Sequence, residues 1–189
     1  ARPLSMDTDH AGRIWVAERH ATDTHSNGSR IVILEDKDHD GKADKSHVFI
    51  EDSALEGPLE ISVFGNRVVA FNPPHLTVYT DTNENLVFEP EIDKRENLLS
   101  GFKRGADTDS VPAIFGGPDG RWYFGHDQAG AEFKDKGGVN FIVRSPALRD
   151  EPNKPENARD LTSQTSGDGK VWVGGFAASV NPDGSGLRI

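Results

Sequence analysis

The chain of 189 residues contains no cysteine, and this absence excludes several kinds of chemistry. Without thiols it can form no disulfide, no zinc–thiolate site, no iron–sulfur cluster and no covalent c-type haem. No apolar run approaches the ~18 residues that a membrane-spanning helix needs. Basic residues are also few, 21 against 31 acidic ones, for a formal net charge of -10. That charge disfavours nucleic acids and anionic membranes as partners.

Long stretches with the 3.6-residue period of an amphipathic helix are missing as well. Glycine (20 residues) and proline (11 residues) are plentiful, and the apolar residues fall in short β-branched or aromatic runs. This pattern predicts an all-β chain of short strands and turns. The length suits one domain with a real core.

The most informative stretch is Asp36–Asp44, which reads D-x-D-x-D-G-x-x-D. It places carboxylates at loop positions 1, 3, 5 and 9 and a glycine, Gly41, at the sharp turn. Such a loop suits a hard cation that takes six to eight oxygen ligands, of which the backbone carbonyl at position 7 supplies one. We therefore predict a Ca²⁺ site. Its expected ligands are Asp36, Asp38, Asp40, Lys42 (through its carbonyl) and Asp44.

The alternative to a calcium site is a solvated acidic turn. Two carboxylates about 5 Å apart repel by roughly 0.8 kcal/mol in water and by about 3 kcal/mol at an effective dielectric of ~20. Four carboxylates make six such pairs, so the repulsion favours a bound cation.

The segments on either side of the acidic loop indicate what the ion does. Arg30–Leu34 and His47–Ile50 are β-branched or aromatic, and loop position 12 is His47 rather than an acidic residue. These features predict two strands instead of the helices of a helix–loop–helix site. The loop is then a hairpin connection, and the ion has the structural role of stapling two strands.

A turn followed by a basic or polar residue and a strand recurs along the chain. The four turns contain Gly12, Gly65, Gly120 and Gly169, spaced by roughly 50 residues. A period of this length, built from strands alone, is typical of propeller blades. We predict a partial β-propeller of about three four-stranded blades. Tryptophans recur on the repeated strands, where we expect core packing: Trp15, Trp122 and Trp172.

The predicted blades cover residues 3–50, 57–102 and 111–189, the last with a polar insertion near 127–169. Strands in this last part of the chain are expected at Val139–Arg144 and Gly186–Ile189. Gly169 either opens a fourth blade or lies before the third strand of blade three, and the short remainder favours the second. In blade two, Asp81–Glu89 looks like a decayed copy of the acidic loop, with Leu86 in the place of glycine. It is either an ordinary hairpin loop or a weaker metal site. The ligands of such a site would be Asp81, Asn83, Asn85 and Glu89.

Blade topology predicts a second functional surface. The ends of the second strands should converge at one mouth of the propeller, on the face opposite the acidic loop, where ligands commonly bind. His20 and His126 there are more typical of a polar rim than of catalytic bases. The residues expected at this mouth are Glu18, Arg19, His20, Asn72, His126 and Asp127.

Five stretches, in order, are similar to one family. They are Ile33–Lys45, Ala70–Leu76, Leu98–Phe102, Gly117–Gly125 and Val180–Leu187. Together they resemble the β-propeller domain of the large haem-binding proteins of planctomycetes and verrucomicrobia that are described as membrane-bound dehydrogenases. The resemblance implies a propeller of about six blades, similar to soluble quinoprotein sugar dehydrogenases. This chain would be its N-terminal half.

Two departures from that family weaken a dehydrogenase interpretation. The haem-attachment motif is absent, and Asp107–Ser110 lacks the histidine pair that usually follows Asp-Thr in the family. A quinone cofactor therefore has no support from the residues. Three functions remain open. The first is a calcium-stabilised binding scaffold in a larger extracytoplasmic protein, periplasmic or secreted. The others are a quinoprotein-like sugar or alcohol dehydrogenase, and a carbohydrate-active hydrolase or lyase.

A half-propeller also implies a partner. The open sheet faces of blade one and blade three would expose apolar surface. We expect a second copy or another protein chain to complete the propeller, unless the chain is part of a longer protein. A carbohydrate is a further candidate ligand.

Overall fold

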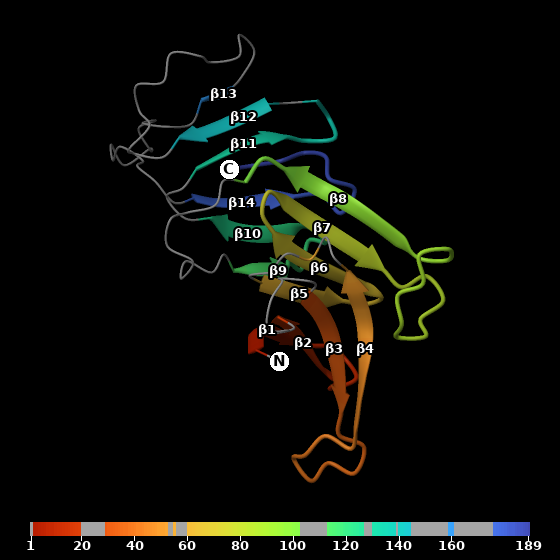
Figure 1. The fold of residues 1–189 in the computed structure, drawn as a ribbon. Coiled ribbons are helices and arrows are strands. Elements are labelled where there is room, and N and C mark those ends of the chain that lie inside the picture. Colours follow the sequence, from red (N-terminus) through yellow and green to blue (C-terminus); the bar gives the residue numbers. More distant parts are fainter. Residues whose placement is uncertain are drawn as a thin grey trace, which may run out of the picture. The chain divides into compact units, whose positions relative to one another are not determined.

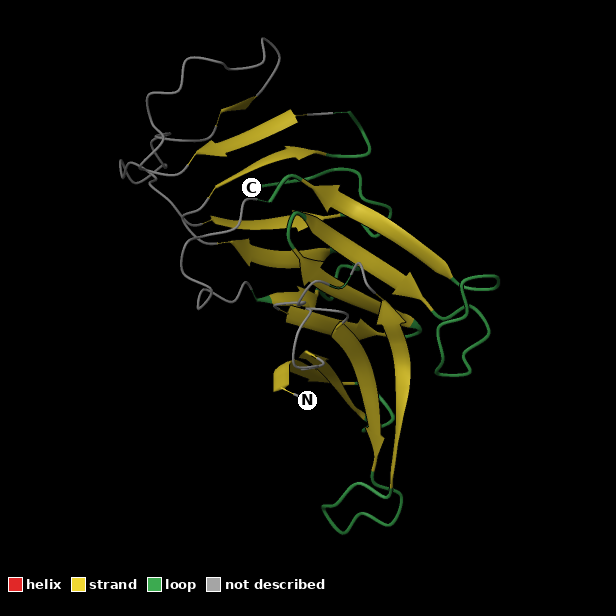
Figure 2. Ribbon diagram, viewed as in Figure 1, coloured by secondary structure: helices red, strands yellow, loops and turns green. Residues whose placement is uncertain are grey.

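The computed structural model describes residues 2–19, 29–52, 55, 60–102, 113–126, 130–138, 140–144, 159–160 and 176–189. Regular structure within these residues consists of strands in four sheets, without a helix (Figures 1 and 2). The predicted all-β class is therefore confirmed, and none of the described sheets closes on itself. Within the same residues, no helix long and apolar enough to cross a membrane is present.

The first sheet is a four-stranded antiparallel meander in chain order. The two strands expected on either side of the acidic loop, at Arg30–Leu34 and His47–Ile50, are confirmed to within two residues. The side chains of β3 alternate between buried and half-buried, because its β-branched residues face the core at every second position. The strands are β1 (Arg2–Thr8), β2 (Ile14–Arg19), β3 (Ser29–Glu35) and β4 (Lys45–Asp52).

The second sheet repeats the same strand order. Its first hairpin closes with a tight turn in which Gly65 has a φ of 61°, a conformation that suits glycine. The strands are β5 (Glu60–Phe64), β6 (Arg67–Asn72), β7 (His75–Thr80) and β8 (Lys94–Ser100).

The chain forms two compact units. The first comprises Ala1–Asn72 and Thr77–Glu96, and the second comprises Pro73–Leu76 and Asn97–Ile189. In the first unit the first meander and the parts of the second that belong to this unit share one hydrophobic core, and β1 also bonds β5 through Asp7, whose Oδ2 accepts from the N–H of Val63 at 2.8 Å. The core residues that are 3 % exposed or less include Trp15, Ile33, Phe49, Ile61, Val68 and Tyr79.

The second unit contains two three-stranded sheets with the orders β14-β10-β9 and β11-β12-β13. The strand expected at Val139–Arg144 is present as β12, but β11 and β13 lie in a region expected to be a polar insertion. The strands are β9 (Ile114–Gly116), β10 (Trp122–His126), β11 (Gly130–Lys134), β12 (Asn140–Arg144), β13 (Arg159–Asp160) and β14 (Phe176–Val180).

Strand β14 pairs with β10, so residues 176–180 supply the third strand of the sheet that β9 opens. This is the arrangement that the sequence favoured, although Gly169 itself lies outside the described residues. The prediction of a strand at Gly186–Ile189 was wrong. A single bridge between Ser179 and Arg188 takes its place, because Gly184 and Gly186 turn the chain with φ of 81° and 62°.

Aromatic rings form the core of the second unit. Phe102 stands edge-on to Phe124 and Phe133, with ring centroids 5.6 and 4.5 Å away. Gly101 is needed beside it, because an added Cβ would lie 1.7 Å from the carbonyl oxygen of Glu132. The predicted core role of tryptophan is confirmed for Trp15 and Trp122, each 3 % exposed. Trp172 lies outside the described residues.

Candidate metal centre

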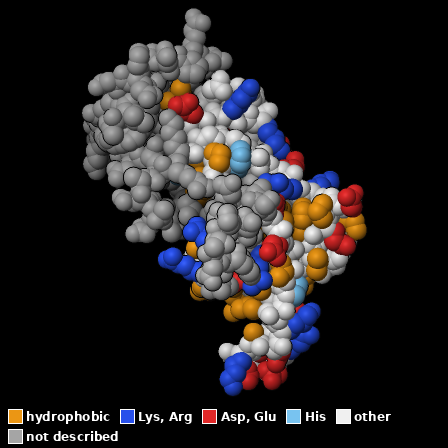
Figure 3. All heavy atoms as spheres, viewed as in Figure 1, with side chains coloured by type: hydrophobic (Ala, Val, Ile, Leu, Met, Phe, Trp, Pro, Cys, Tyr) orange, Lys and Arg blue, Asp and Glu red, His pale blue; other side chains and the backbone are white. Residues whose placement is uncertain are grey.

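The Asp36–Asp44 loop connects β3 to β4, as the sequence predicted. The last antiparallel pair is Glu35 with Lys45, and the N–H of Asp44 donates to the carbonyl of Glu35 at 2.8 Å. The loop therefore stands at the tip of the β3–β4 hairpin (Figure 1). In the space-filling view, acidic and basic side chains gather at that tip (Figure 3).

Left-handed residues shape the loop. His39 and Gly41 have φ of 60° and 86°. This geometry lets the N–H of Gly41 donate to Asp36 Oδ2 at 2.9 Å and the N–H of Lys42 donate to Asp40 Oδ1 at 2.8 Å. These backbone bonds restrain the carboxylates, so binding an ion would cost less conformational entropy.

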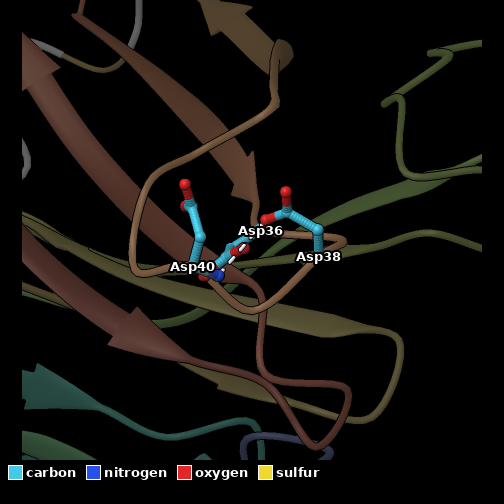
Figure 4. A group of neighbouring side chains, drawn as sticks. All are labelled: Asp36, Asp38 and Asp40. Atoms are coloured by element: carbon cyan, nitrogen blue, oxygen red, sulfur yellow. Dashed lines mark hydrogen bonds between the residues drawn. The ribbon is translucent and has the colours of Figure 1, made fainter.

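Three of the predicted ligands come together in this loop. One carboxylate oxygen each of Asp36, Asp38 and Asp40 lie within 4.8 Å of one another, and Figure 4 shows the three side chains. Oxygens that bind one Ca²⁺ at 2.3–2.6 Å lie at most about 5 Å apart, so this spacing fits a shared ion. The backbone N–H of Asp40 also donates to Asp38 Oδ1 at 3.2 Å, which holds the Asp38 side chain against the loop.

Asp36 carries the clearest sign that the loop suits a cation. Its Oδ1 is buried, and no hydrogen-bond donor from the described part of the chain reaches it. A buried carboxylate oxygen without a partner costs free energy, on the order of 1–3 kcal/mol or more. A cation beside Asp38 and Asp40 would remove that cost, so the residues present fit Ca²⁺.

The other two predicted ligands are less clearly placed. Asp44 is not part of the three-carboxylate group, and its Oδ2 accepts from the N–H of Lys37 at 2.7 Å, which closes the loop. The side chain of Lys42 points its Nζ to within 3.8 Å of Asp40 Oδ2. That ion pair is largely exposed and therefore weak.

Charges at the base of the loop also favour the ionised form of Glu35. Burial opposes ionisation of Glu35, but the hydrogen bond and charge of Lys45 outweigh it and hold the pKa of this carboxyl below its usual value. Lys45 Nζ lies 3.3 Å from Glu35 Oε1, and His47 Nδ1 lies 3.6 Å from the same oxygen.

The Asp81–Glu89 loop has the same backbone as the acidic loop. Glu84 and Leu86 have φ of 56° and 66°, at the positions of His39 and Gly41. As in the acidic loop, the sixth residue bonds back to the first, with the N–H of Leu86 donating to Asp81 Oδ2 at 2.8 Å.

The side chains of this second loop are arranged differently. The amide groups of Asn83 and Asn85 both donate to Glu89 Oε2, at 2.9 and 2.8 Å. Asp93 accepts from the N–H of Thr82 at 2.7 Å, which is the part that Asp44 plays in the acidic loop. In this second loop, the asparagine amide protons thus neutralise part of the charge of Glu89, the role that a cation would have in the acidic loop.

The residues expected at a ligand-binding mouth are engaged in local contacts. Glu18 accepts a hydrogen bond from Arg30, and Arg19 is exposed at the end of β2. Asn72 ends β6 and is 6 % exposed. His126 is 8 % exposed and stands edge-on to the ring of Phe102. His20 and Asp127 lie outside the described residues.

Comparison with known proteins assigns a family. Residues 1–179 match the family described as a domain of unknown function, DUF7133. The chain belongs to the DUF7133 family. No curated protein matches the DUF7133 chain.

Solved structures give a weaker likeness to the DUF7133 chain. An iodide structure of a Trichoderma reesei carbohydrate-active enzyme of family AA12 has a TM-score of 0.42 and 17% identity. A calcium structure of a Trichoderma reesei enzyme of the same family has a TM-score of 0.43 and 19% identity. Each match covers 65% of the DUF7133 chain and 29% of the longer enzyme chain.

The DUF7133 chain also has a groove that its sequence did not indicate. It measures about 890 Å³ and lies in the first unit, between β4 and residues 87–96. Phe49 and Phe88 line it, and the N–H of Phe88 donates to the carbonyl of Phe49 at 2.7 Å. The sequence gives no signal for it, because its walls are distant segments that only the tertiary fold brings together.

Charged groups surround one end of this groove in the DUF7133 chain. Arg95 Nε lies 3.6 Å from Asp52 Oδ2, and the guanidinium lies 5.9 Å from the ring centroid of Tyr79. Burial, and then the charge of Asp52, raise the pKa of the Tyr79 hydroxyl, which donates to Asp52 Oδ2 at 3.4 Å. The hydroxyl therefore stays protonated at neutral pH and serves as a fixed hydrogen-bond donor.

Proposed function

We propose that the chain is a calcium-stabilised β-propeller module that serves as a binding scaffold in a larger extracytoplasmic protein or assembly. The observation that carries this proposal is the buried, unpartnered Oδ1 of Asp36 beside the oxygens of Asp38 and Asp40. Ca²⁺ accepts six to eight oxygens in irregular geometry, and such a loop suits it better than it suits a smaller ion.

The calcium ion would act on the hairpin rather than on a substrate. Asp36, Asp38 and Asp40 would hold it, while Asp44 keeps the loop closed through the N–H of Lys37. Because the ion neutralises carboxylates that otherwise repel one another, it stabilises the end of the hairpin where Glu35 pairs with Lys45. This role is structural.

The propeller part of the proposal is supported by the repeated meander. Two successive four-stranded sheets have their strands in chain order and contribute to one hydrophobic core, as successive blades of a propeller do. An extracytoplasmic setting is supported by the loop, because calcium sites of modest affinity are suited to compartments rich in calcium.

Thermal melting with calcium and with a chelator tests the proposal. At a free calcium concentration about 100 times the Kd, binding adds about 2.7 kcal/mol of stability. For a chain of this size that amounts to roughly 5–11 °C in Tm. Equal Tm values in calcium and in chelator would contradict the proposal.

Asp38→Asn is the sharpest variant for this test. Asparagine keeps the Oδ1 that accepts the N–H of Asp40 but loses the negative charge, so the loop should fold and lose most of its calcium response. Glu91→Gln is the matched control, because Glu91 is exposed and lies outside the acidic loop. It should keep the full shift, and magnesium should replace calcium poorly in both proteins.

A further inference from the structure

Two turns in different sheets have the same geometry. In Asp9–Arg13 and in Gly117–Arg121, the N–H of the first residue donates to the carbonyl of the fifth, at 3.1 and 2.8 Å. The N–H of the fourth residue donates to the carbonyl of the first at 3.0 Å in both. The fourth residues, Gly12 and Gly120, have φ of 78° and 77°. The strands that follow, β2 and β10, are therefore in equivalent register.

Side-chain contacts support this equivalence. Trp15 is the second residue of β2, and its Nε1 donates to Asp9 Oδ2 at 2.9 Å. Tyr123 is the second residue of β10, and its hydroxyl donates to Asp119 Oδ2 at 2.9 Å. In both turns an aromatic side chain bonds its polar tip to a turn carboxylate, so Trp15 and Tyr123 occupy the same place.

The two equivalent faces differ in what covers them. On the first sheet, Trp15 and Ala17 are 3 % and 0 % exposed, because the second sheet packs on them. On the third sheet, the matching face is not covered by any sheet that the structure describes: Phe115 is 54 % exposed and Ile189 is 43 % exposed. A hollow of about 410 Å³ lies on it. We call this the receiving face, and it comprises Ala113, Phe115, Tyr123, Gly125, Ala177 and Ile189.

The structure also shows what kind of surface covers such a face. The second sheet covers the first with Ile61 and Val68, which lie on paired strands β5 and β6. Arg67 precedes Val68 just as Arg13 precedes Ile14, so Ile14 holds the place of Val68.

By the same register, Met6 on β1 holds the place of Ile61 on β5. Met6 is 70 % exposed and Ile14 is 39 % exposed, and they lie on the face of the first sheet that points away from Trp15. We call Met6, Ile14 and Val16 the docking face. One chain thus carries an open receiving face and an open docking face of the kind that covers its equivalent.

We propose that a second copy of the chain covers the receiving face with its own docking face, in a head-to-tail contact. This proposal rests on the proposed function, because it assumes that the repeated sheets follow one another as propeller blades. It does not require a bound calcium ion. The receiving face suits an apolar partner. In the first unit, the polar side chains of Ser5 and Asp7 on β1 bond the backbone of β5. On the third sheet the equivalent positions are Ala113 and Phe115, which are apolar. The contact therefore buries apolar surface and leaves no polar group of these two positions unpaired.

The mass of the chain in solution, measured by light scattering after size exclusion, tests the proposal. The wild-type chain should show two copies or more at high concentration and move toward one copy on dilution. Phe115→Glu and Met6→Glu should each give a single copy, because each places a charge in one of the two faces. Ile92→Glu is the control, since Ile92 is 49 % exposed but belongs to neither face, and its mass should match the wild type.

Mixing the two variants separates a head-to-tail contact from a symmetric one. An equimolar mixture of Phe115→Glu and Met6→Glu should recover a two-copy species, because each variant keeps the face that the other has lost. Melting curves of each variant show that it is folded. A wild-type chain that stays a single copy at every concentration, or a mixture that does not recover, would overturn the proposal. The calcium melting test decides the scaffold's metal separately, since either experiment can fail while the other succeeds.

Discussion

Leu86 adopts the left-handed backbone conformation that Gly41 adopts in the acidic loop, with φ of 66° against 86°. In each loop the N–H of this residue donates to the first aspartate, at 2.8 Å to Asp81 and 2.9 Å to Asp36. The two loops therefore share one backbone, although only the first carries three clustered carboxylates. The positive φ of the sixth loop residue therefore belongs to the hairpin backbone and does not require a bound calcium ion.

We expect Gly41→Ala to destabilise the chain through the backbone alone. No atom lies within 4 Å of the Cβ that alanine would add, so the cost arises from the positive φ. That cost is about 1–2 kcal/mol, or roughly 2–8 °C in Tm, measured by calorimetry in excess calcium. Gly41→Asn is the control, because asparagine tolerates this conformation. Equal losses in both variants would contradict the explanation.

The second loop should acquire a calcium site when its amides become carboxylates. Asn83→Asp with Asn85→Asp places two charges against Glu89, to which both asparagine side chains now donate. In chelator the double variant should therefore melt below the wild type, and in calcium it should recover. Isothermal titration should count one more calcium per chain than in the wild type.

The control for that experiment is Asn83→Ser with Asn85→Ser, which removes the amide donors without adding charge. It should lower Tm equally in calcium and in chelator. An unchanged calcium count in the aspartate variant would show that the shared backbone is not enough to build the site.

Asp9 should make the stability of the first unit sensitive to acid. Burial opposes its ionisation, but hydrogen bonds from Trp15 and Arg13 outweigh that effect and lower the pKa of the carboxyl. Because the folded-state pKa is below the unfolded one, the carboxylate stabilises the chain fully above about pH 4 and loses this effect as pH falls through the folded pKa.

Asp9→Asn should therefore melt below the wild type at pH 7, and the difference should shrink as the pH is lowered toward 3. Bonds to a charged group contribute about 1.5–3 kcal/mol, so a difference of several degrees is expected at pH 7. Glu91→Gln, which changes an exposed carboxylate, should leave the melting curve unchanged across the range. A constant gap between Asp9→Asn and wild type at every pH would contradict the assignment.

Local features of the chain were predictable from sequence. The β3–β4 hairpin follows from β-branched runs on both sides of a loop with fixed turn chemistry, and Gly41 has the positive φ that its place required. Strand β8 was missed because Lys94, Arg95 and Glu96 show no apolar alternation, and its order comes from pairing with β7.

The environment of His126 could have been inferred from alternation. Trp122, Phe124 and His126 are buried at every second position of β10, so the histidine shares the core face. The part played by Asp93 had no such signal. The sequence comparison of the two loops covered nine positions, Asp81–Glu89, and Asp93 lies at position 13, beyond that comparison. Only the fold brings its carboxylate to the N–H of Thr82.

The bond from the N–H of Phe88 to the carbonyl of Phe49 has a consequence for aggregation. Strand β4 is the last strand of its sheet, and such an edge offers unpaired backbone groups to any extended segment of another molecule. Residues 87–96 face β4 across the groove, and the bond from Phe88 covers the β4 edge at Phe49. The loop that copies the backbone of the metal site thus protects the first sheet from edge-to-edge fibre growth. Replacing the loop with a short turn would leave the sheet folded while exposing it to polymerisation.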